Sequence, residues 1–447
     1  MKKGINALIA VGFIIMAIAP AAAQQIIGGS WEGVLKVTPQ MNIRIVLNIE
    51  NKGGVTTVTL DSPDQNAYGI PGQVKYISAD SVNVSVSAIG ASYAGRLKDG
   101  NLEGVFRQAM AQLPMTMKPG KEELKRLQTP VPPFPYTTED VAFTTNQLDS
   151  YALTGTLTLP RGWNAETPMV VMVTGSGIQN RDEEVAGHRP FAVIADYLAR
   201  NGIGSLRYDD RGYGAEGQTP DFTSETFAKD ARAAVDCLRE RKFRKVGVLG
   251  HSEGGMIAFM LAADKTAPSF IVTMGAPALR GDSLLCDQNL AILEAGATPR
   301  DVTDRYIAAL HELYAKKIAH QQIDVDALTA AWPATPVYAQ LKDNLRKIAA
   351  DNNKWMDYFI AYSPAKSIAA THVPALALYG GKDVQVRASA NAYRLRLLNP
   401  AVDVRVFPGL NHLKQHAVTG LPTEYAALEE TISPEVLSAI VEFIKRQ

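Results

Sequence analysis

A buried strand, a tight turn and a buried helix follow one another around Ser252. The strand is the apolar run 246–249, the helix is the apolar run 256–263, and the turn has the sequence Gly-His-Ser-Glu-Gly at 250–254. So sharp a turn forces the residues two before and two after the serine together, so that a Cβ atom at either position would clash. The pattern predicts that Ser252 projects above a buried sheet in a layered fold of strands and helices.

The chain from about 138 to 447 alternates between strand and helix patterns. Continuous apolar runs, typical of strands buried on both faces, occur at Met169–Val173, Val246–Leu249, Phe270–Met274, Ala375–Tyr379 and Val402–Phe407. This alternation predicts an α/β domain, a mostly parallel sheet with helices on both faces. Between about 281 and 362 only helical patterns occur, and we expect this insertion to form a lid over a site at the strand ends.

A different pattern precedes this domain. Residues 24–118 alternate apolar and polar positions with turn signals between the runs, which predicts seven or eight antiparallel strands in a small all-β barrel or sandwich. A proline-rich linker, 119–137, is expected to be an extended spacer. The module has no histidine, cysteine or serine elbow, so we expect it to contribute no catalytic group. Its aromatic residues either form a contact surface or fill the barrel core: Trp31, Tyr68, Tyr76 and Tyr93.

The N-terminus predicts export. Lys2 and Lys3 precede an apolar run of about 13 residues, and small residues lead to a cleavage site after Ala23. The run is short of the roughly 20 residues that span a bilayer. We therefore expect residues 1–23 to be a cleavable signal peptide, with a periplasmic or secreted mature protein and no stable membrane insertion.

Composition excludes several classes of protein. The 45 basic residues balance the 45 acidic residues, which gives no electrostatic reason to bind nucleic acid. Two cysteines, Cys237 and Cys286, are too few for a disulfide scaffold or a cysteine-rich zinc module. We expect two unpaired buried thiols, with a Cys237–Cys286 bridge in an oxidising compartment as the alternative. Oligomeric state is left open.

With its serine elbow in this context, the region 138–447 resembles the α/β-hydrolase superfamily, in its serine esterase and peptidase-like branch. The whole chain, with Gly-Ser-Trp-Glu-Gly at 29–33 in the β module, is similar to exported bacterial carboxylesterases. The resemblance implies an α/β-hydrolase fold, no metal or organic cofactor, and a catalytic order of nucleophile, acid and histidine.

The histidine and the acid are therefore sought after Ser252. His412 directly follows the strand run 402–407, where a base that accepts the serine proton is expected. His416, one helical turn further on, is its rival. Asp383 follows the strand run 375–379 on a glycine-rich loop and is the expected acid. The rival pair Asp209-Asp210 precedes the nucleophile and adjoins Arg211, which suggests a structural ion pair.

Two backbone N–H groups are expected to form an oxyanion hole. One belongs to Glu253, at the start of the helix, and the other to Ser176 or Gly177 in the loop after the first central strand. The choice between the latter two is open. The charged residues 181–184 of the same loop either line the rim of the site or are merely solvated.

These residues predict a serine hydrolase that cleaves a small-molecule carboxylic ester through an acyl-enzyme intermediate. Activity should rise with pH along one ionisation near 6–7. Trp355 and Phe359 are candidate substrate-binding residues, with core packing as the alternative. Two other functions remain: an aminopeptidase or acyl-peptide hydrolase, with Glu253 or Glu183 binding a free amino terminus, and a non-catalytic binding protein on the same scaffold.

Overall fold

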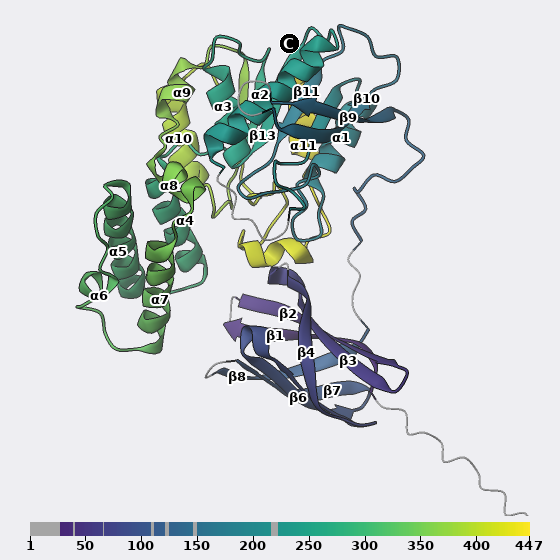
Figure 1. Cartoon of the computed structure of the whole chain (residues 1–447), viewed down its shortest axis with the longest axis vertical. Coiled ribbons are helices and arrows are strands. Elements are labelled where there is room, and N and C mark those ends of the chain that lie inside the picture. The colour runs from purple at the N-terminus through teal and green to yellow at the C-terminus, as the bar shows by residue number, and fades with distance from the viewer. Residues whose placement is uncertain are drawn as a thin grey trace, which may run out of the picture.

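A computed structural model describes residues 27–38, 41–65, 67–108, 111–120, 125–145, 150–215 and 222–447. The predicted signal peptide, residues 1–23, lies outside these ranges. Figure 1 shows a β barrel at one end of the molecule and a layered α/β domain at the other, with a group of helices beside them.

The N-terminal module is a closed barrel of eight antiparallel strands rather than a sandwich. Pairing of Glu32 with Lys118 and of Gly33 with Met117 closes it between the first and last strands. Trp31 and Tyr93 belong to its core, whereas Tyr68 and Tyr76 are 54% and 57% exposed. Its strands are β1 Gly29–Thr38, β2 Met41–Lys52, β3 Val55–Ser62, β4 Ala67–Ile77, β5 Ser81–Val86, β6 Ala91–Lys98, β7 Asn101–Gln108 and β8 Ala111–Pro119, with short 3-10 helices η1 Pro63–Gln65 and η2 Ser87–Ile89.

The second sheet also has eight strands, in the order β16-β15-β14-β13-β11-β12-β10-β9. β9 and β10 pair antiparallel, β10 pairs antiparallel with β12, and the other neighbours are parallel. The mostly parallel sheet predicted from the apolar runs is confirmed. Its strands are β9 Thr137–Thr144, β10 Ala152–Leu159, β11 Met169–Val173, β12 Gly204–Tyr208, β13 Val246–His251, β14 Ile271–Met274, β15 Ala375–Gly380 and β16 Asp403–Phe407.

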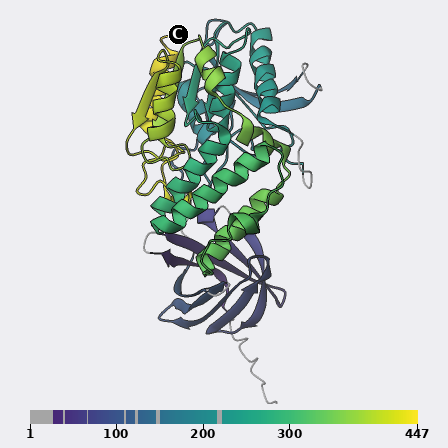
Figure 2. The same ribbon diagram turned by 90° about the vertical axis from the view of Figure 1, so that its left-hand side faces the viewer.

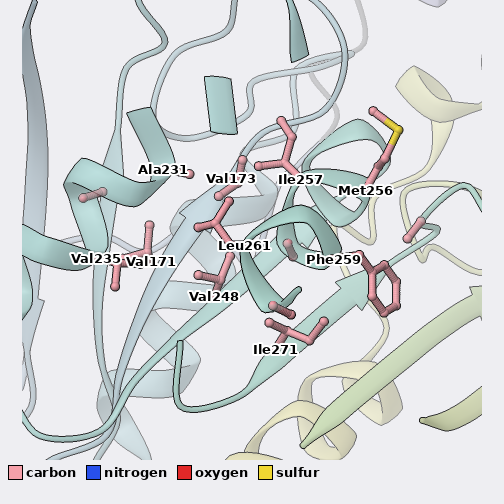
Figure 3. Close-up of a cluster of buried hydrophobic side chains, with 14 of the residues drawn as sticks. Val171, Val173, Ala231, Val235, Val248, Met256, Ile257, Phe259, Leu261 and Ile271 are labelled. Atoms are coloured by element: carbon pink, nitrogen blue, oxygen red, sulfur yellow. The ribbon is translucent and has the colours of Figure 1, made fainter. Parts of the chain in front are cut away.

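Helices cover both faces of this sheet, because alternate residues of each central strand point to opposite sides. Val171 and Val173 pack with α2 (Ser224–Glu240) and α3 (Glu253–Ala262) in the cluster drawn in Figure 3. Val170 and Met172 pack on the other face with α1 (Pro190–Arg200) and α11 (Pro434–Ile444). The remaining helices of this domain are α9 Ala365–Ala370, α10 Ala388–Leu398 and the 3-10 helix η3 Pro422–Ala427.

A helical insertion separates β14 from β15. It consists of α4 Gly281–Ala295, α5 Arg300–Ile318, α6 Val325–Leu328, α7 Pro336–Ala350 and α8 Lys354–Ala361. In both views α5, α6 and α7 extend away from the sheet towards the level of the barrel (Figures 1 and 2). They enclose a core of their own, which includes Leu310, Leu313 and Leu345. Within the insertion, α4 and α8 lie beside the strand ends, where they line a cavity together with Ser252.

The segment between the two domains is docked on the α/β domain instead of standing free. Arg126 donates hydrogen bonds to the carbonyl oxygens of Ala186, Ala426 and Leu428. Gln128 donates to the Ile432 carbonyl at 2.7 Å and accepts from the Thr431 N–H at 2.6 Å. These contacts hold residues 126 and 128 against η3 and the loops beside it.

Two further predictions can be compared with the structure. Cys237 and Cys286 are free thiols, as expected, although only Cys286 is fully buried. Burial raises the pKa of the Cys286 thiol to about 12. Across the described ranges, no helix has the length and apolar character needed to cross a membrane.

Candidate active site

Ser252 occupies a strained turn between β13 and α3. Its backbone angles are φ 53° and ψ −117°, a region that residues with a side chain rarely adopt. A Cβ atom on Gly250 would lie 2.0 Å from the Gly254 carbonyl oxygen, and one on Gly254 would lie 2.1 Å from that of Val173. Both glycines are therefore required sterically. The Ser252 N–H donates to the Met274 carbonyl at 2.8 Å, which ties the turn to the neighbouring strand β14.

The histidine and the acid follow β16 and β15. His412 Nδ1 lies 2.8 Å from Asp383 Oδ2, and both side chains are buried. Asp383 Oδ1 accepts the N–H groups of Gln385 and Val386 at 2.9 and 2.8 Å. Because the carboxylate only accepts hydrogen bonds, His412 carries a proton on Nδ1 and leaves Nε2 free to take a proton from a nucleophile.

Opposing effects set the ionisation of this pair. Burial would raise the pKa of Asp383, but the charges of His412 and Lys414 and the hydrogen bonds from His412 and Val386 lower it to about 2. Burial lowers the pKa of His412, and the nearby His251 and Lys414 lower it further, while Asp383 acts in the other direction. Lys414 Nζ lies 3.6 Å from Asp383 Oδ2 and donates to the His412 carbonyl at 2.8 Å. The pKa of His412 therefore lies below the usual value for histidine, and its ring stays neutral to a lower pH.

This lowered pKa changes the expected pH profile. A base must be neutral to accept a proton, so kcat/KM should fall only as the pH drops through a value below the ordinary 6.5 of histidine. Ester hydrolysis measured from pH 4 to 8 should show a plateau at neutral pH and one acid limb. An acid limb centred above 6.5 would contradict the assignment of His412 as the base.

One cavity of about 330 Å³ joins these groups. Ser252, His412 and Ser176 all line it. Apolar side chains from the insertion form one wall: Leu284 and Leu285 of α4, and Trp355 and Phe359 of α8. Phe359 lines the cavity and also packs in the main hydrophobic core, so both roles considered from the sequence hold for this residue. The volume lies in the range of sites for small ligands, roughly 300–1,000 Å³.

The loop after β11 packs against the turn that carries Ser252: a Cβ atom on Gly175 would lie 3.3 Å from Ser252 Cβ. Ser176 lines the cavity, whereas Gly177 is not among its lining residues, which favours Ser176 as the second oxyanion donor. The Gly175 N–H is already used, because it donates to Glu183 Oε1 at 2.8 Å. Glu253 is the first residue of α3, and its N–H has no acceptor within the helix. Ser176 thus borders the cavity, and Glu253 directly follows Ser252, which also borders it.

Glu253 also connects the elbow to the lid through its side chain. Its buried carboxylate accepts hydrogen bonds from Ser224 Oγ at 2.6 Å and from Trp355 Nε1 at 2.9 and 3.1 Å. Burial raises the pKa of Glu253, and hydrogen bonds from Ser224, Trp355 and Ser176 oppose that rise. Glu253, the residue after Ser252, therefore contacts α8 of the insertion, whose Trp355 lines the cavity.

A second carboxylate–histidine pair supports the site. Glu183 is buried, not solvated, and its Oε1 lies 2.8 Å from His251 Nδ1. His251 Nε2 lies 3.1 Å from the His412 carbonyl oxygen. Both ring nitrogens of His251 therefore face acceptor oxygens, one from Glu183 and one from His412. Glu183 thus links the Gly175 loop, the elbow and the His412 loop, a role that sequence alone did not predict.

The rival residues have other partners. His416 is exposed, and its Nδ1 lies 2.9 Å from Glu430 Oε2. Asp209 pairs with Arg181, and Arg211 pairs with Asp230, so the predicted ion pair exists with different partners. Asp210 accepts hydrogen bonds from Thr174 and from the Gln179 N–H and so braces the loop after β11. Burial raises the pKa of Asp210 to about 7, although these hydrogen bonds oppose the rise.

Metal ligands are not assembled around the serine. Within the described residues, no group of three or more histidine, cysteine, aspartate or glutamate side chains is placed to hold a metal ion.

The mostly parallel sheet, the serine elbow after β13 and the histidine–carboxylate pair after β15 and β16 define the α/β-hydrolase fold. Residues 188–414 match the family described as "Serine aminopeptidase, S33". The chain belongs to this family.

An esterase and a serine hydrolase are among the named relatives of this chain. "Esterase EstD" of Thermotoga maritima is 30% identical over 265 residues, a match that covers 58% of this chain and 58% of that protein. Human "Serine hydrolase BPHL" is 43% identical over 70 residues, 15% of this chain and 23% of that protein. The chain therefore spans little more than half the length of the first of these relatives. Among solved structures, the Pyrococcus furiosus esterase Pf2001 aligns with 70% of this chain and 93% of its own, at 18% identity and a TM-score of 0.40.

Proposed function

We propose that the protein is a serine hydrolase that cleaves small carboxylic esters through an acyl-enzyme intermediate. One observation carries the proposal: Ser252, on a strained elbow, lines the same cavity as His412, whose Nδ1 lies 2.8 Å from the buried Asp383. The esterase relative supports the choice of an ester as substrate.

The proposed mechanism uses these groups in two steps. Ser252 Oγ attacks the ester carbonyl while His412 Nε2 takes its proton, and the N–H groups of Glu253 and Ser176 stabilise the negative oxygen. His412 then protonates the leaving alcohol. A water molecule, activated by the same histidine, releases the acid from Ser252. Asp383 stays ionised throughout and stabilises the protonated His412.

Covalent labelling tests this proposal directly. A fluorophosphonate probe should modify Ser252 in the folded protein, as read by peptide mass spectrometry, and p-nitrophenyl acetate should be hydrolysed. Labelled protein that hydrolyses no ester would argue against the ester substrate. A protein that neither reacts with the probe nor turns over any substrate would support the non-catalytic alternative.

An aminopeptidase or acyl-peptide hydrolase is the second candidate. Glu183 favours it, because this residue lines the cavity and its buried Oε2 has no hydrogen-bond partner among the described residues. Glu253 is a poor candidate for binding an amino terminus, since Ser224 and Trp355 already occupy its carboxylate. Turnover of aminoacyl p-nitroanilides in preference to p-nitrophenyl esters would establish this second function.

The lid should decide which esters are accepted. Trp355 lines the cavity and stacks on Phe359 with ring centroids 5.2 Å apart. Trp355→Ala should enlarge the acyl space and shift the preferred chain length of p-nitrophenyl esters upwards. Trp332→Ala is the matched control, since Trp332 packs on Tyr338 inside the insertion and does not line the cavity. A uniform loss across all chain lengths in Trp355→Ala, with a lower Tm, would show that this residue only packs.

We further propose that the protein works outside the cytoplasm, on the basis of the signal pattern in residues 1–23. Cell fractionation of the full chain, with N-terminal sequencing of the product, would test this; a mature protein that still begins at Met1 would contradict it.

A further inference from the structure

A second hollow lies where the barrel meets the α/β domain. Its volume is about 490 Å³, and it is lined by Tyr68 of β4, by Gln179, Asn180 and Glu184 of the loop after β11, and by Tyr213 of the loop after β12. Gln179 also lines the cavity that contains Ser252 and His412. The two spaces therefore adjoin through one side chain of the proposed oxyanion loop.

The barrel places Tyr68 in this hollow through a braced segment. Asp61 Oδ1 accepts the Gly69 N–H at 2.7 Å, next to Tyr68. Asp64 in η1 accepts the Arg44 N–H at 2.6 Å and forms an ion pair with the Arg44 guanidinium. Arg126 holds the other side of the junction, since it donates to the Ala186 carbonyl beside the loop after β11. Tyr68 is thus presented by ordered elements and not by a free loop.

The chemistry of this hollow is polar, aromatic and free of excess charge. Tyr68 and Tyr213 are 54% and 51% exposed, so their rings and hydroxyl groups are available to a ligand. Asn180 Nδ2 lies within hydrogen-bond distance of the Tyr213 hydroxyl and of Glu184 Oε2. Glu184 also pairs with Arg189 at 3.3 Å, which compensates its charge. Flat aromatic faces beside neutral hydrogen-bonding groups suit a ligand that combines C–H faces with hydroxyl groups.

We infer that this junction is a subsite for the alcohol part of the substrate, and that this alcohol is a neutral polyhydroxylated ring, that is, a carbohydrate. The inference rests on the proposed ester hydrolysis. The apolar wall of α4 and α8 suits the acyl group on one side of Ser252, so the polar hollow beyond Gln179 remains for the alcohol. The barrel, which holds no catalytic group, would then act as a specificity module through Tyr68.

Selectivity between two acetate esters tests the subsite. We compare kcat/KM for an acetylated methyl cellobioside with kcat/KM for p-nitrophenyl acetate, in the full chain. Tyr68→Ala and Tyr213→Ala should each lower the ratio on the order of tenfold, through KM for the sugar ester, because a ring contact is lost. Tyr68→Phe should keep most of the ratio. Tyr76→Ala is the matched control: Tyr76 is 57% exposed on the same strand and does not line the hollow, so the ratio should not change.

Binding without turnover separates this inference from the proposed function. The Ser252→Ala protein should bind the acetylated cellobioside saturably in calorimetric titration, and adding Tyr68→Ala should weaken that binding on the order of tenfold. If Tyr68→Ala abolished the binding of the sugar ester while the wild-type protein hydrolysed no ester, the subsite would be supported and the proposed esterase function would be rejected. Ester hydrolysis with no saturable binding, or with the same ratio in Tyr68→Ala as in Tyr76→Ala, would reject the subsite and retain the esterase.

Discussion

Ser252→Ala and His412→Ala should each lower kcat by roughly 10³–10⁶-fold, with the fold retained. In the proposed mechanism Ser252 supplies the attacking oxygen, and the free Nε2 of His412 takes its proton. Neither side chain is needed for the elbow or for the loop after β16, because the backbone groups of both residues have partners: the Ser252 N–H donates to the Met274 carbonyl, and the His412 carbonyl oxygen lies within hydrogen-bond distance of His251 Nε2 and Lys414 Nζ. Initial rates with p-nitrophenyl acetate and thermal unfolding measure the two effects separately.

The double variant and one control sharpen this test. Because serine and histidine act as a unit, Ser252→Ala with His412→Ala should be no slower than either single variant. His416→Ala should retain turnover, since His416 is exposed and pairs with Glu430. If His416→Ala lost activity and His412→Ala kept it, the base would be assigned to the wrong histidine.

Asp383→Asn should lower kcat by roughly 10⁴-fold, because the hydrogen bonds of Asp383 would orient the new amide with its NH₂ group towards His412. The N–H groups of Gln385 and Val386 both donate to Oδ1, so the asparagine amide must keep its oxygen at that position. Its NH₂ group then replaces Oδ2 and faces His412 Nδ1. His412 is forced to carry its proton on Nε2, and it can no longer accept one from Ser252.

The effect of Asp383→Asn on stability depends on Lys414, and a second substitution at Lys414 separates that effect from the loss of activity. Its buried ammonium group lies 3.6 Å from Asp383 Oδ2, so the neutral amide leaves a positive charge without its carboxylate and should lower the Tm. Adding Lys414→Met should recover much of the Tm while the loss of activity remains. An Asp383→Asn protein that kept more than about a tenth of the wild-type kcat would show that another group orients His412.

The supporting shell explains why the candidate site is more than three residues. Glu183 links the Gly175 loop to His251, and His251 contacts the His412 carbonyl. Glu253 links the elbow to Trp355 of the lid. Each carboxylate joins segments that are far apart in the chain, so a change at either one would remove a contact between two parts of the site.

Local pattern determined much of this protein. Apolar runs at 169–173 and 375–379 predicted buried parallel strands because both faces of such a strand need apolar side chains, and alternation in residues 41–49 predicted a barrel or sandwich strand for the complementary reason. The turn at 250–254 predicted the strained Ser252, since only glycine fits the contacts around it. These features depend on neighbours within a few residues, so a single sequence displays them.

Tertiary structure alone decided which distant residues meet. The charged run 181–184 left open whether its side chains were solvated, and packing buried Glu183 against His251 while Arg181 paired with Asp209. Tyr68 and Tyr93 looked alike in the barrel sequence, yet one lines the junction and the other fills the core. These polar groups are paired by loops that lie 28 to 161 residues apart in the sequence, and no local period or motif encodes that meeting.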